Sequence, residues 1–144
     1  MADTTFKAAA HSPATLETII TSRTHTFTLD EPKELGGTDI GMNPVEALLG
    51  ALGACKCIVA RAFASKHKIK LNDIVVECSG VLDPDGFLGK NPEAKIGFSS
   101  IHTVFRIDAD NTREELEQFI EFVDATCPVQ DTLTKPATMS HELA

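Results

Sequence analysis

The sequence predicts an α+β fold with mostly antiparallel strands, because its segments follow one another as strands, helix, strands and helix. Residues 16–32 are rich in Thr, Ile and Phe, which is typical of two strands or one bent strand. Residues 44–66 carry apolar side chains at helical spacing. Residues 72–83 indicate a further strand, residues 99–110 alternate well enough to be its partner, and an amphipathic helix follows.

Length and charge narrow the class of protein. The chain has 144 residues, and we expect a single domain over residues 1–144. A net charge of -8, with 13 basic and 21 acidic residues, argues against nucleic acid as a partner, because phosphates need clustered Lys and Arg. The N-terminus lacks the pattern of a signal peptide, and the longest apolar run is shorter than the about 20 residues of a membrane span. We therefore expect no membrane contact and a cytoplasmic location, where thiols are normally reduced.

The first helix carries the strongest local signal in the chain. Asn43 suits the N-cap, Pro44 the first helical position, and Glu46 the place where a capping box has its acid. The apolar spacing predicts a helix to about Lys66, roughly 35 Å long. Gly50 and Gly53 inside it indicate a close approach of another backbone. Because the helix is apolar on nearly all sides, we expect it to be covered on most of them, in part by a second subunit.

The second helix is predicted to begin with another capping box. Thr112 and Glu115 supply it, and the apolar spacing extends the helix over about residues 113–125. The segment "ATCPVQDTL", residues 125–133, then places Cys127 at the N-cap and Pro128 at the first position of a short third helix.

The chain has four cysteines, and two of them are candidates for chemistry. Cys55 is predicted on the apolar face of the first helix, where it is either a small buried hydrophobe or a nucleophile activated by a cation or donor from elsewhere. Cys127 at a helix start faces free N–H groups, which favour a thiolate, or it is merely a small residue before a proline. Cys57 is rotated by about 200° from Cys55 on the helix, so the two cannot share a site. The spacing of Cys55 and Cys57 disfavours a metal site. Cys78 is expected to lie within a strand and to belong to the core.

The loop and helix of residues 30–55 and the Cys-Pro segment of residues 125–133 together resemble the OsmC/Ohr family of thiol-dependent organic hydroperoxide reductases. Residues 30–55, "DEPKELGGTDIGMNPVEALLGALGAC", are similar to the family's glycine loop and central helix, with a cysteine after the Asn-Pro pair. Residues 125–133 are similar to its second-cysteine segment, a Cys-Pro pair followed by a short helix. The resemblance implies an intertwined homodimer, in which curved antiparallel sheets wrap around long central helices and the active sites lie at the subunit interface.

The resemblance also implies a reaction. Cys55 matches the peroxidatic cysteine, whose thiolate attacks an organic hydroperoxide and becomes a sulfenic acid. Cys127 matches the resolving cysteine, which condenses with the sulfenic acid to form a disulfide. A dithiol reductant, in this family typically a dihydrolipoyl group, then restores both thiols. No cofactor and no metal are implied.

The family activates the peroxidatic cysteine with an arginine and a glutamate. Arg23, which precedes the glycine loop, is the best match for the arginine and would stabilise the thiolate; Arg61 and Arg106 are weaker candidates. In the hydroperoxide-resistance branch the glutamate directly follows the Asn-Pro pair, where this chain has Val45. Glu46 matches an acid of the OsmC and OsmC-like branches, and its other role is to close the capping box.

Three functions stay open on these grounds. The two matching cysteines favour a thiol-dependent peroxidase that reduces organic hydroperoxides to alcohols. Val45 leaves room for a divergent protein that binds a small apolar ligand or senses oxidation without efficient turnover. A structural domain with inert cysteines is the third interpretation.

Overall fold

The computed structural model describes residues 2–144, which form two compact units. The first unit ends at Leu48, and the second unit comprises Leu49–Ala144. The fold is α+β with antiparallel sheets, as the sequence predicts. The single domain over residues 1–144 and the homodimer stay predictions.

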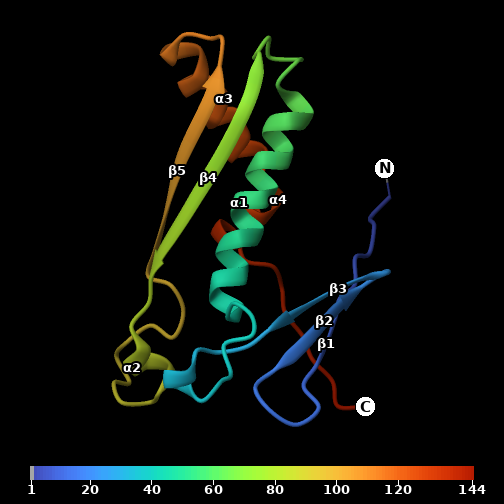
Figure 1. Cartoon of the computed structure of the whole chain (residues 1–144), viewed down its shortest axis with the longest axis vertical. Coiled ribbons are helices and arrows are strands. Elements are labelled where there is room, and N and C mark those ends of the chain that lie inside the picture. The colour runs from blue at the N-terminus through green and yellow to red at the C-terminus, as the bar shows by residue number, and fades with distance from the viewer. Residues whose placement is uncertain (1) are drawn as a thin grey trace. The chain divides into compact units, whose positions relative to one another are not determined.

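The first unit contains a three-stranded antiparallel sheet in the order β1, β2, β3 (Figure 1). β2 (Thr18–Ser22) and β3 (His25–Leu29) form a hairpin, with Thr18 opposite Leu29 and Ser22 opposite His25. Residues 16–32 therefore form two strands and not one bent strand. β1 (Ala9–His11) was not predicted, because it is only three residues long and exposed throughout, and so lacks an alternating pattern.

The glycine loop after β3 is organised by one carboxylate. Asp30 is buried, and its two oxygens accept hydrogen bonds from the N–H of Glu31 (2.8 Å), the hydroxyl of Thr38 (2.7 Å) and the N–H of Thr38 (3.0 Å). The Thr38 hydroxyl and then the Glu31 N–H lower the pKa of Asp30, because they bond to its charged form. The short 3-10 helix η1 (Lys33–Leu35) lies within the loop that these bonds close.

We predict that Gly37→Ala destabilises this loop. A Cβ atom at residue 37 would lie 1.9 Å from the carbonyl oxygen of Glu31, a backbone atom that cannot move alone. We expect a loss of about 3 kcal/mol or more in the free energy of unfolding, measured by urea denaturation. Gly97→Ala is the matched control, because nothing lies within 4 Å of its added Cβ. Equal midpoints for the two variants would contradict this loop structure.

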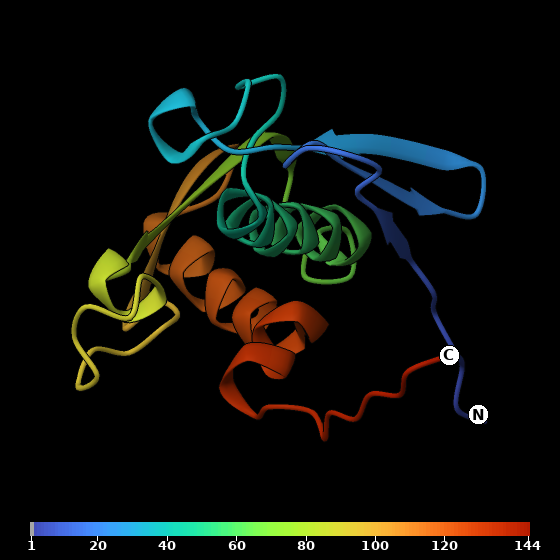
Figure 2. The same ribbon diagram turned by 90° about the horizontal axis from the view of Figure 1, so that it is seen from below.

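The second unit contains most of the long helix α1 (Pro44–Phe63), together with a strand pair and three further helices. β4 (Leu71–Val81) pairs antiparallel with β5 (Ser100–Ala109), as predicted (Figure 1). Seen from below, α3 runs alongside α1 on the same side of the strand pair (Figure 2). The remaining helices are listed with their bounds: α2 (Pro84–Phe87), α3 (Arg113–Thr126) and α4 (Pro128–Thr134).

Both predicted capping boxes are present. At the start of α1 the N–H of Asn43 donates to Glu46 Oε2 and the N–H of Glu46 donates to Asn43 Oδ1, each at 2.9 Å. Thr112 and Glu115 form the same reciprocal pair at the start of α3. α1 ends at Phe63, slightly earlier than predicted, and the turn that follows it contains Lys68 with a positive φ of 58°.

The core of the second unit joins α1, α3 and the strand pair. Its buried members are Val59, Ala60, Ala64, Ile69, Phe119 and Val123. Gly53 makes the predicted close approach, since a Cβ there would lie 3.2 Å from the carbonyl oxygen of Val76 on β4. Nothing lies within 4 Å of a Cβ built at Gly50. The predicted close approach of another backbone therefore does not occur at this residue within the chain.

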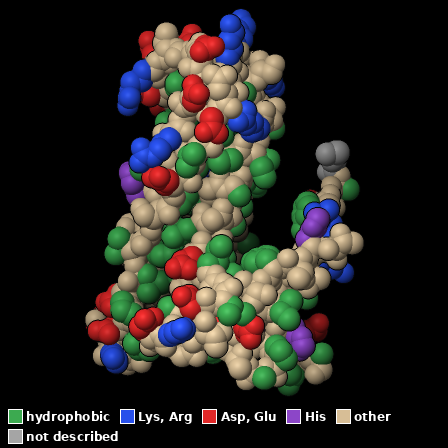
Figure 3. All heavy atoms as spheres, viewed as in Figure 1, with side chains coloured by type: hydrophobic (Ala, Val, Ile, Leu, Met, Phe, Trp, Pro, Cys, Tyr) green, Lys and Arg blue, Asp and Glu red, His purple; other side chains and the backbone are tan. Residues whose placement is uncertain are grey.

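Part of α1 presents apolar side chains to solvent. Ile58 is 68% exposed, and Ala51, Ala54 and Ala62 on neighbouring turns are exposed as well. The space-filling view shows hydrophobic side chains along the middle of the second unit, whereas charged side chains gather at its upper end (Figure 3). Residues 2–144 contain no helix with the length and apolar character required to cross a bilayer.

Candidate functional site

Cys55 lies at mid-length in α1, half-buried against the core of the second unit. Burial raises the pKa of its thiol, because an apolar environment disfavours the thiolate. The backbone N–H of Val129 opposes burial and lowers this pKa, the neighbouring Cys127 thiol raises it, and the positive charge of Lys56 lowers it. The net pKa of Cys55 is above its ordinary value.

Cys127 occupies the N-cap of α4, as predicted. Its backbone is extended, with φ -73° and ψ 111°, and Pro128 follows at the first helical position. The residue is only 1% exposed, and its Sγ accepts a hydrogen bond from the N–H of Gln130 at 3.4 Å. The sulfur therefore satisfies one of the free N–H groups at the start of this helix.

The structure brings Cys55 and Cys127 together, although α1 and α4 are far apart in the sequence. The two thiols are close enough for Cys127 to perturb the titration of Cys55. Both are free thiols. Two neighbouring thiols can form a disulfide when an oxidant takes up the two electrons that the bond releases.

The N–H group that lowers the pKa of Cys55 belongs to α4, whose Cys127 the resemblance pairs with Cys55, but the sequence analysis named no donor there. Cys55 gains nothing from the dipole of α1, because it lies in the middle of that helix. The N–H of Val129, at the second position of α4, is one of the free donors at a helix N-terminus. Only the tertiary packing of α4 against α1 provides this contact, and no local pattern in the sequence reports it.

Lys56 is the functional candidate that the sequence analysis missed. Its side chain is completely buried, and its Nζ donates to Asp124 Oδ1 on α3 and to Gln130 Oε1 on α4. The ammonium also lies 5.6 Å from the centre of the Phe105 ring on β5. The available signal was a lysine between two cysteines in an otherwise apolar helix.

Arg23 and Glu46 belong to the first unit, and their predicted roles at Cys55 stay predictions. Arg23 lies in the turn between β2 and β3, with a positive φ of 55°. The carboxylate of Glu46 accepts the N–H of Asn43, so its capping role is the one that the structure describes.

The two weaker arginine candidates are engaged elsewhere. Arg61 donates to the carbonyl oxygens of Leu71 (3.0 Å) and Asn72 (2.9 Å) at the start of β4. Arg106 pairs with Glu77 across the β4–β5 strands, at 3.1 Å between Nη2 and Oε2. Arg61 therefore joins α1 to the start of β4, and Arg106 forms an exposed ion pair across the two strands.

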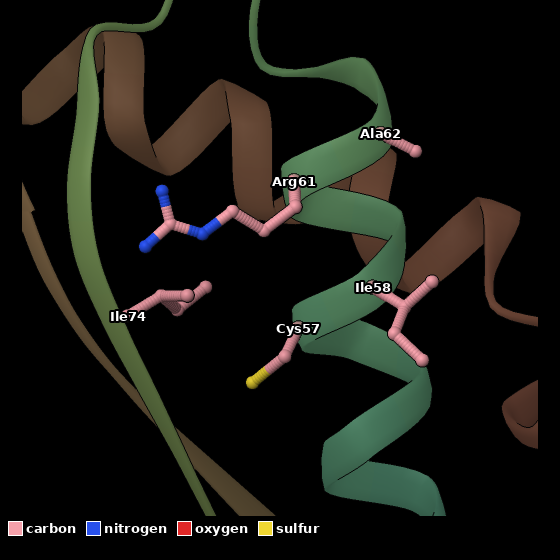
Figure 4. A pocket seen from close by; sticks show the side chains of 5 residues that line it. All are labelled: Cys57, Ile58, Arg61, Ala62 and Ile74. Carbon is pink, nitrogen blue, oxygen red and sulfur yellow. The ribbon is translucent and has the colours of Figure 1, made fainter.

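Cys57 faces away from the Cys55–Cys127 pair, as the helical rotation predicts. It lines a hollow of about 570 Å³ with four other residues: Ile58, Arg61, Ala62 and Ile74. Figure 4 shows Cys57 and Arg61 pointing from α1 toward Ile74, while Ile58 and Ala62 point to the other side.

The sulfur of Cys78 on β4 lies 3.6 Å from the Thr103 hydroxyl. Residues 2–144 contain no group of three or more His, Cys, Asp or Glu side chains that could hold a metal ion.

The fold and the paired thiols define a class: an α+β protein in which a cysteine of a long helix meets a cysteine at the cap of a short one. The family model for OsmC-like proteins matches residues 36–142. The chain therefore belongs to the OsmC-like family.

Two bacterial relatives support this assignment. A hydroperoxide reductase of Mycoplasma genitalium is 33% identical over 109 residues, which are 74% of this chain and 71% of the relative. The hydroperoxide reductase of Mycoplasma pneumoniae is 32% identical over the same shares of the two chains.

Solved structures share the fold over nearly the whole chain. An OsmC-like protein from Mycoplasma pneumoniae superimposes with a TM-score of 0.81 at 27% identity, covering 94% of this chain and 91% of that one. An organic hydroperoxide resistance protein from Legionella pneumophila gives a TM-score of 0.66 at 23% identity, covering 94% and 93% of the two chains. The second likeness shows the fold alone.

Proposed function

We propose that this protein is a thiol-dependent peroxidase that reduces organic hydroperoxides to alcohols. The observation that carries the proposal is the meeting of the Cys55 thiol with the Cys127 thiol and the Val129 N–H. The relatives named hydroperoxide reductase point to the same chemistry. We also propose that the protein acts as a cytoplasmic homodimer, in which Arg23 and Glu46 assist Cys55.

The reaction begins with the Cys55 thiolate attacking the distal oxygen of R–O–O–H. The S–O bond forms as the O–O bond breaks, the alkoxide takes a proton and leaves as the alcohol, and Cys55 becomes a sulfenic acid. The Cys127 sulfur then attacks the Cys55 sulfur and displaces water, which forms the disulfide. A dithiol such as a dihydrolipoyl group reduces this disulfide by exchange and becomes a disulfide itself.

Apolar surroundings suit an organic substrate. Cys55 packs against a core of Val, Ala, Ile and Phe side chains, which favour an alkyl or aryl group over bulk water. The same surroundings keep the pKa of Cys55 high, so the Val129 N–H and the Lys56 charge must supply part of the thiolate stabilisation. Because the reactive form is the thiolate, the first step accelerates as the pH rises toward this pKa.

We predict that one equivalent of cumene hydroperoxide produces a Cys55–Cys127 disulfide. The expected result is a loss of two thiols and a single cross-linked peptide pair, read by mass spectrometry of a non-reducing digest. Cys57 and Cys78 remain free in the same digest and serve as internal controls. A link that joins Cys55 to Cys78 would contradict the proposed pairing.

The raised pKa of Cys55 favours a second candidate, an oxidation sensor with slow turnover. A mainly neutral thiol reacts slowly, and Val45 stands where one branch of the family has a glutamate. Stopped-flow consumption of cumene hydroperoxide with an excess of dithiol separates the two. Repeated rapid turnover indicates the peroxidase, and one slow oxidation per chain indicates the sensor.

A further inference from the structure

The buried positive charge of Lys56 is stabilised by neighbouring side chains. A buried ammonium is costly unless its donors find acceptors. Two of its three N–H donors reach Asp124 and Gln130, and the ring of Phe105 lies near the charge. We call these four residues the Lys56 network. Asp124 is its one charged partner, and the side chain of Asp124 is 41% exposed.

The Lys56 network connects four separate elements of the second unit. Lys56 comes from α1, Asp124 from α3, Gln130 from α4 and Phe105 from β5. α4 has only seven residues and none of its side chains is buried, so apolar packing alone fixes it weakly. The contact from Lys56 to Gln130 therefore holds α4 at a defined place on α1.

Gln130 also connects the network to the cysteine pair. Its side-chain oxygen accepts from Lys56, while its backbone N–H donates to Cys127 Sγ at 3.4 Å. Its neighbour Val129 supplies the N–H that stabilises a Cys55 thiolate. Gln130 thus links the buried ammonium to the Cys127 sulfur, and it directly follows the residue whose N–H lowers the pKa of Cys55.

We propose that Lys56 is a positioning residue, which holds the N-terminus of α4 against Cys55 so that the Val129 donor and the Cys127 sulfur stay within reach. This inference rests on the proposed function for its biological role, but the placement itself can be measured without peroxide. Lys56 contacts no reacting atom: it acts on the placement of α4 through Gln130 and on Cys55 through its positive charge.

Groups from each packed element bear on the titration of Cys55. Lys56 on α1 contributes a positive charge, and Cys127, the N-cap of α4, contributes a second thiol. Asp124 on α3 is paired with Lys56 and partly offsets its charge. Removal of Lys56 thus removes both the favourable charge and the support of the Val129 donor, and both losses shift the titration of Cys55 to higher pH.

The test replaces Lys56 with Met, which has a similar length but no charge and no donor. We expect Lys56→Met to slow alkylation of Cys55 by iodoacetamide about 10-fold at pH 7, with the pH midpoint moved up by about one unit. We also expect diamide to close the Cys55–Cys127 disulfide about 10-fold more slowly. Lys66→Met, in the exposed turn after α1, is the matched control and should behave like the wild type.

Two milder variants keep the test decisive if Lys56→Met does not fold. Gln130→Leu removes the acceptor on α4 and should slow disulfide closure, whereas Gln130→Glu keeps an acceptor and should restore it. Wild-type rates and an unchanged pH profile in folded Lys56→Met, or in Gln130→Leu, would overturn the inference. Diamide closes the disulfide without peroxide, so a wild type that fails to consume cumene hydroperoxide refutes the proposed function and leaves this measurement valid.

Discussion

Cys55→Ser is expected to reduce the consumption of cumene hydroperoxide by about 10³-fold or more, as loss of an attacking nucleophile does in other enzymes. A serine hydroxyl forms no appreciable anion at neutral pH and cannot cycle through a sulfenic acid. The substitution removes one sulfur from a half-buried position, so the fold should persist. Stopped-flow kinetics with a dithiol in excess measures the loss.

The matched control for this prediction lies two residues away on the same helix. Cys57 faces the hollow beside Ile74 and not Cys127, so Cys57→Ser should leave the rate within about 2-fold of the wild type. A rate that survives Cys55→Ser would rule out Cys55 as the peroxidatic residue, whereas a rate that collapses in Cys57→Ser would show that Cys57 is also needed for turnover.

Cys127→Ser is expected to separate the two halves of the reaction. The first step needs only Cys55, so one equivalent of alcohol should still form in a burst. The sulfenic acid then has no partner thiol and accumulates, and steady-state turnover should fall by about 100-fold. Trapping with dimedone, read by mass spectrometry at Cys55, measures the accumulated intermediate.

The serine oxygen in this variant can still accept the N–H of Gln130, so the helix cap is retained. That makes Cys127→Ser a better probe than an alanine substitution, which would remove the cap together with the sulfur. Full turnover in Cys127→Ser would show that the dithiol reduces the sulfenic acid directly and that Cys127 is not the resolving residue.

Features set by a few neighbouring residues could be predicted from the sequence. The two capping boxes, the strand character of residues 16–32 and the position of Cys127 at a helix start all depend on residues within a short stretch of chain. Each is a local balance of hydrogen bonds and apolar spacing, and so a single sequence reports it directly.

The environment of Cys55 depends instead on contacts between distant segments. The Val129 donor reaches Cys55 only because α4 packs on α1, and Lys56 becomes a buried charge only because Asp124 and Gln130 meet it there. In the sequence, Lys56 only interrupts the apolar pattern of its helix. Its burial becomes understandable once the structure shows its acceptors on α3 and α4. For Arg23, the sequence predicts a role beside Cys55. The structure places this residue in a turn of the first unit.

The sulfur of Cys127 is also the atom that caps the start of α4. In the reduced chain its lone pair accepts the N–H of Gln130, so the thiol is part of the hydrogen bonding that lets a seven-residue helix begin. Any change in the bonding of that sulfur alters its strength as an acceptor and, with it, the free energy of the first helical turn. Local helix stability and thiol chemistry at this residue are therefore thermodynamically linked, each biasing the other.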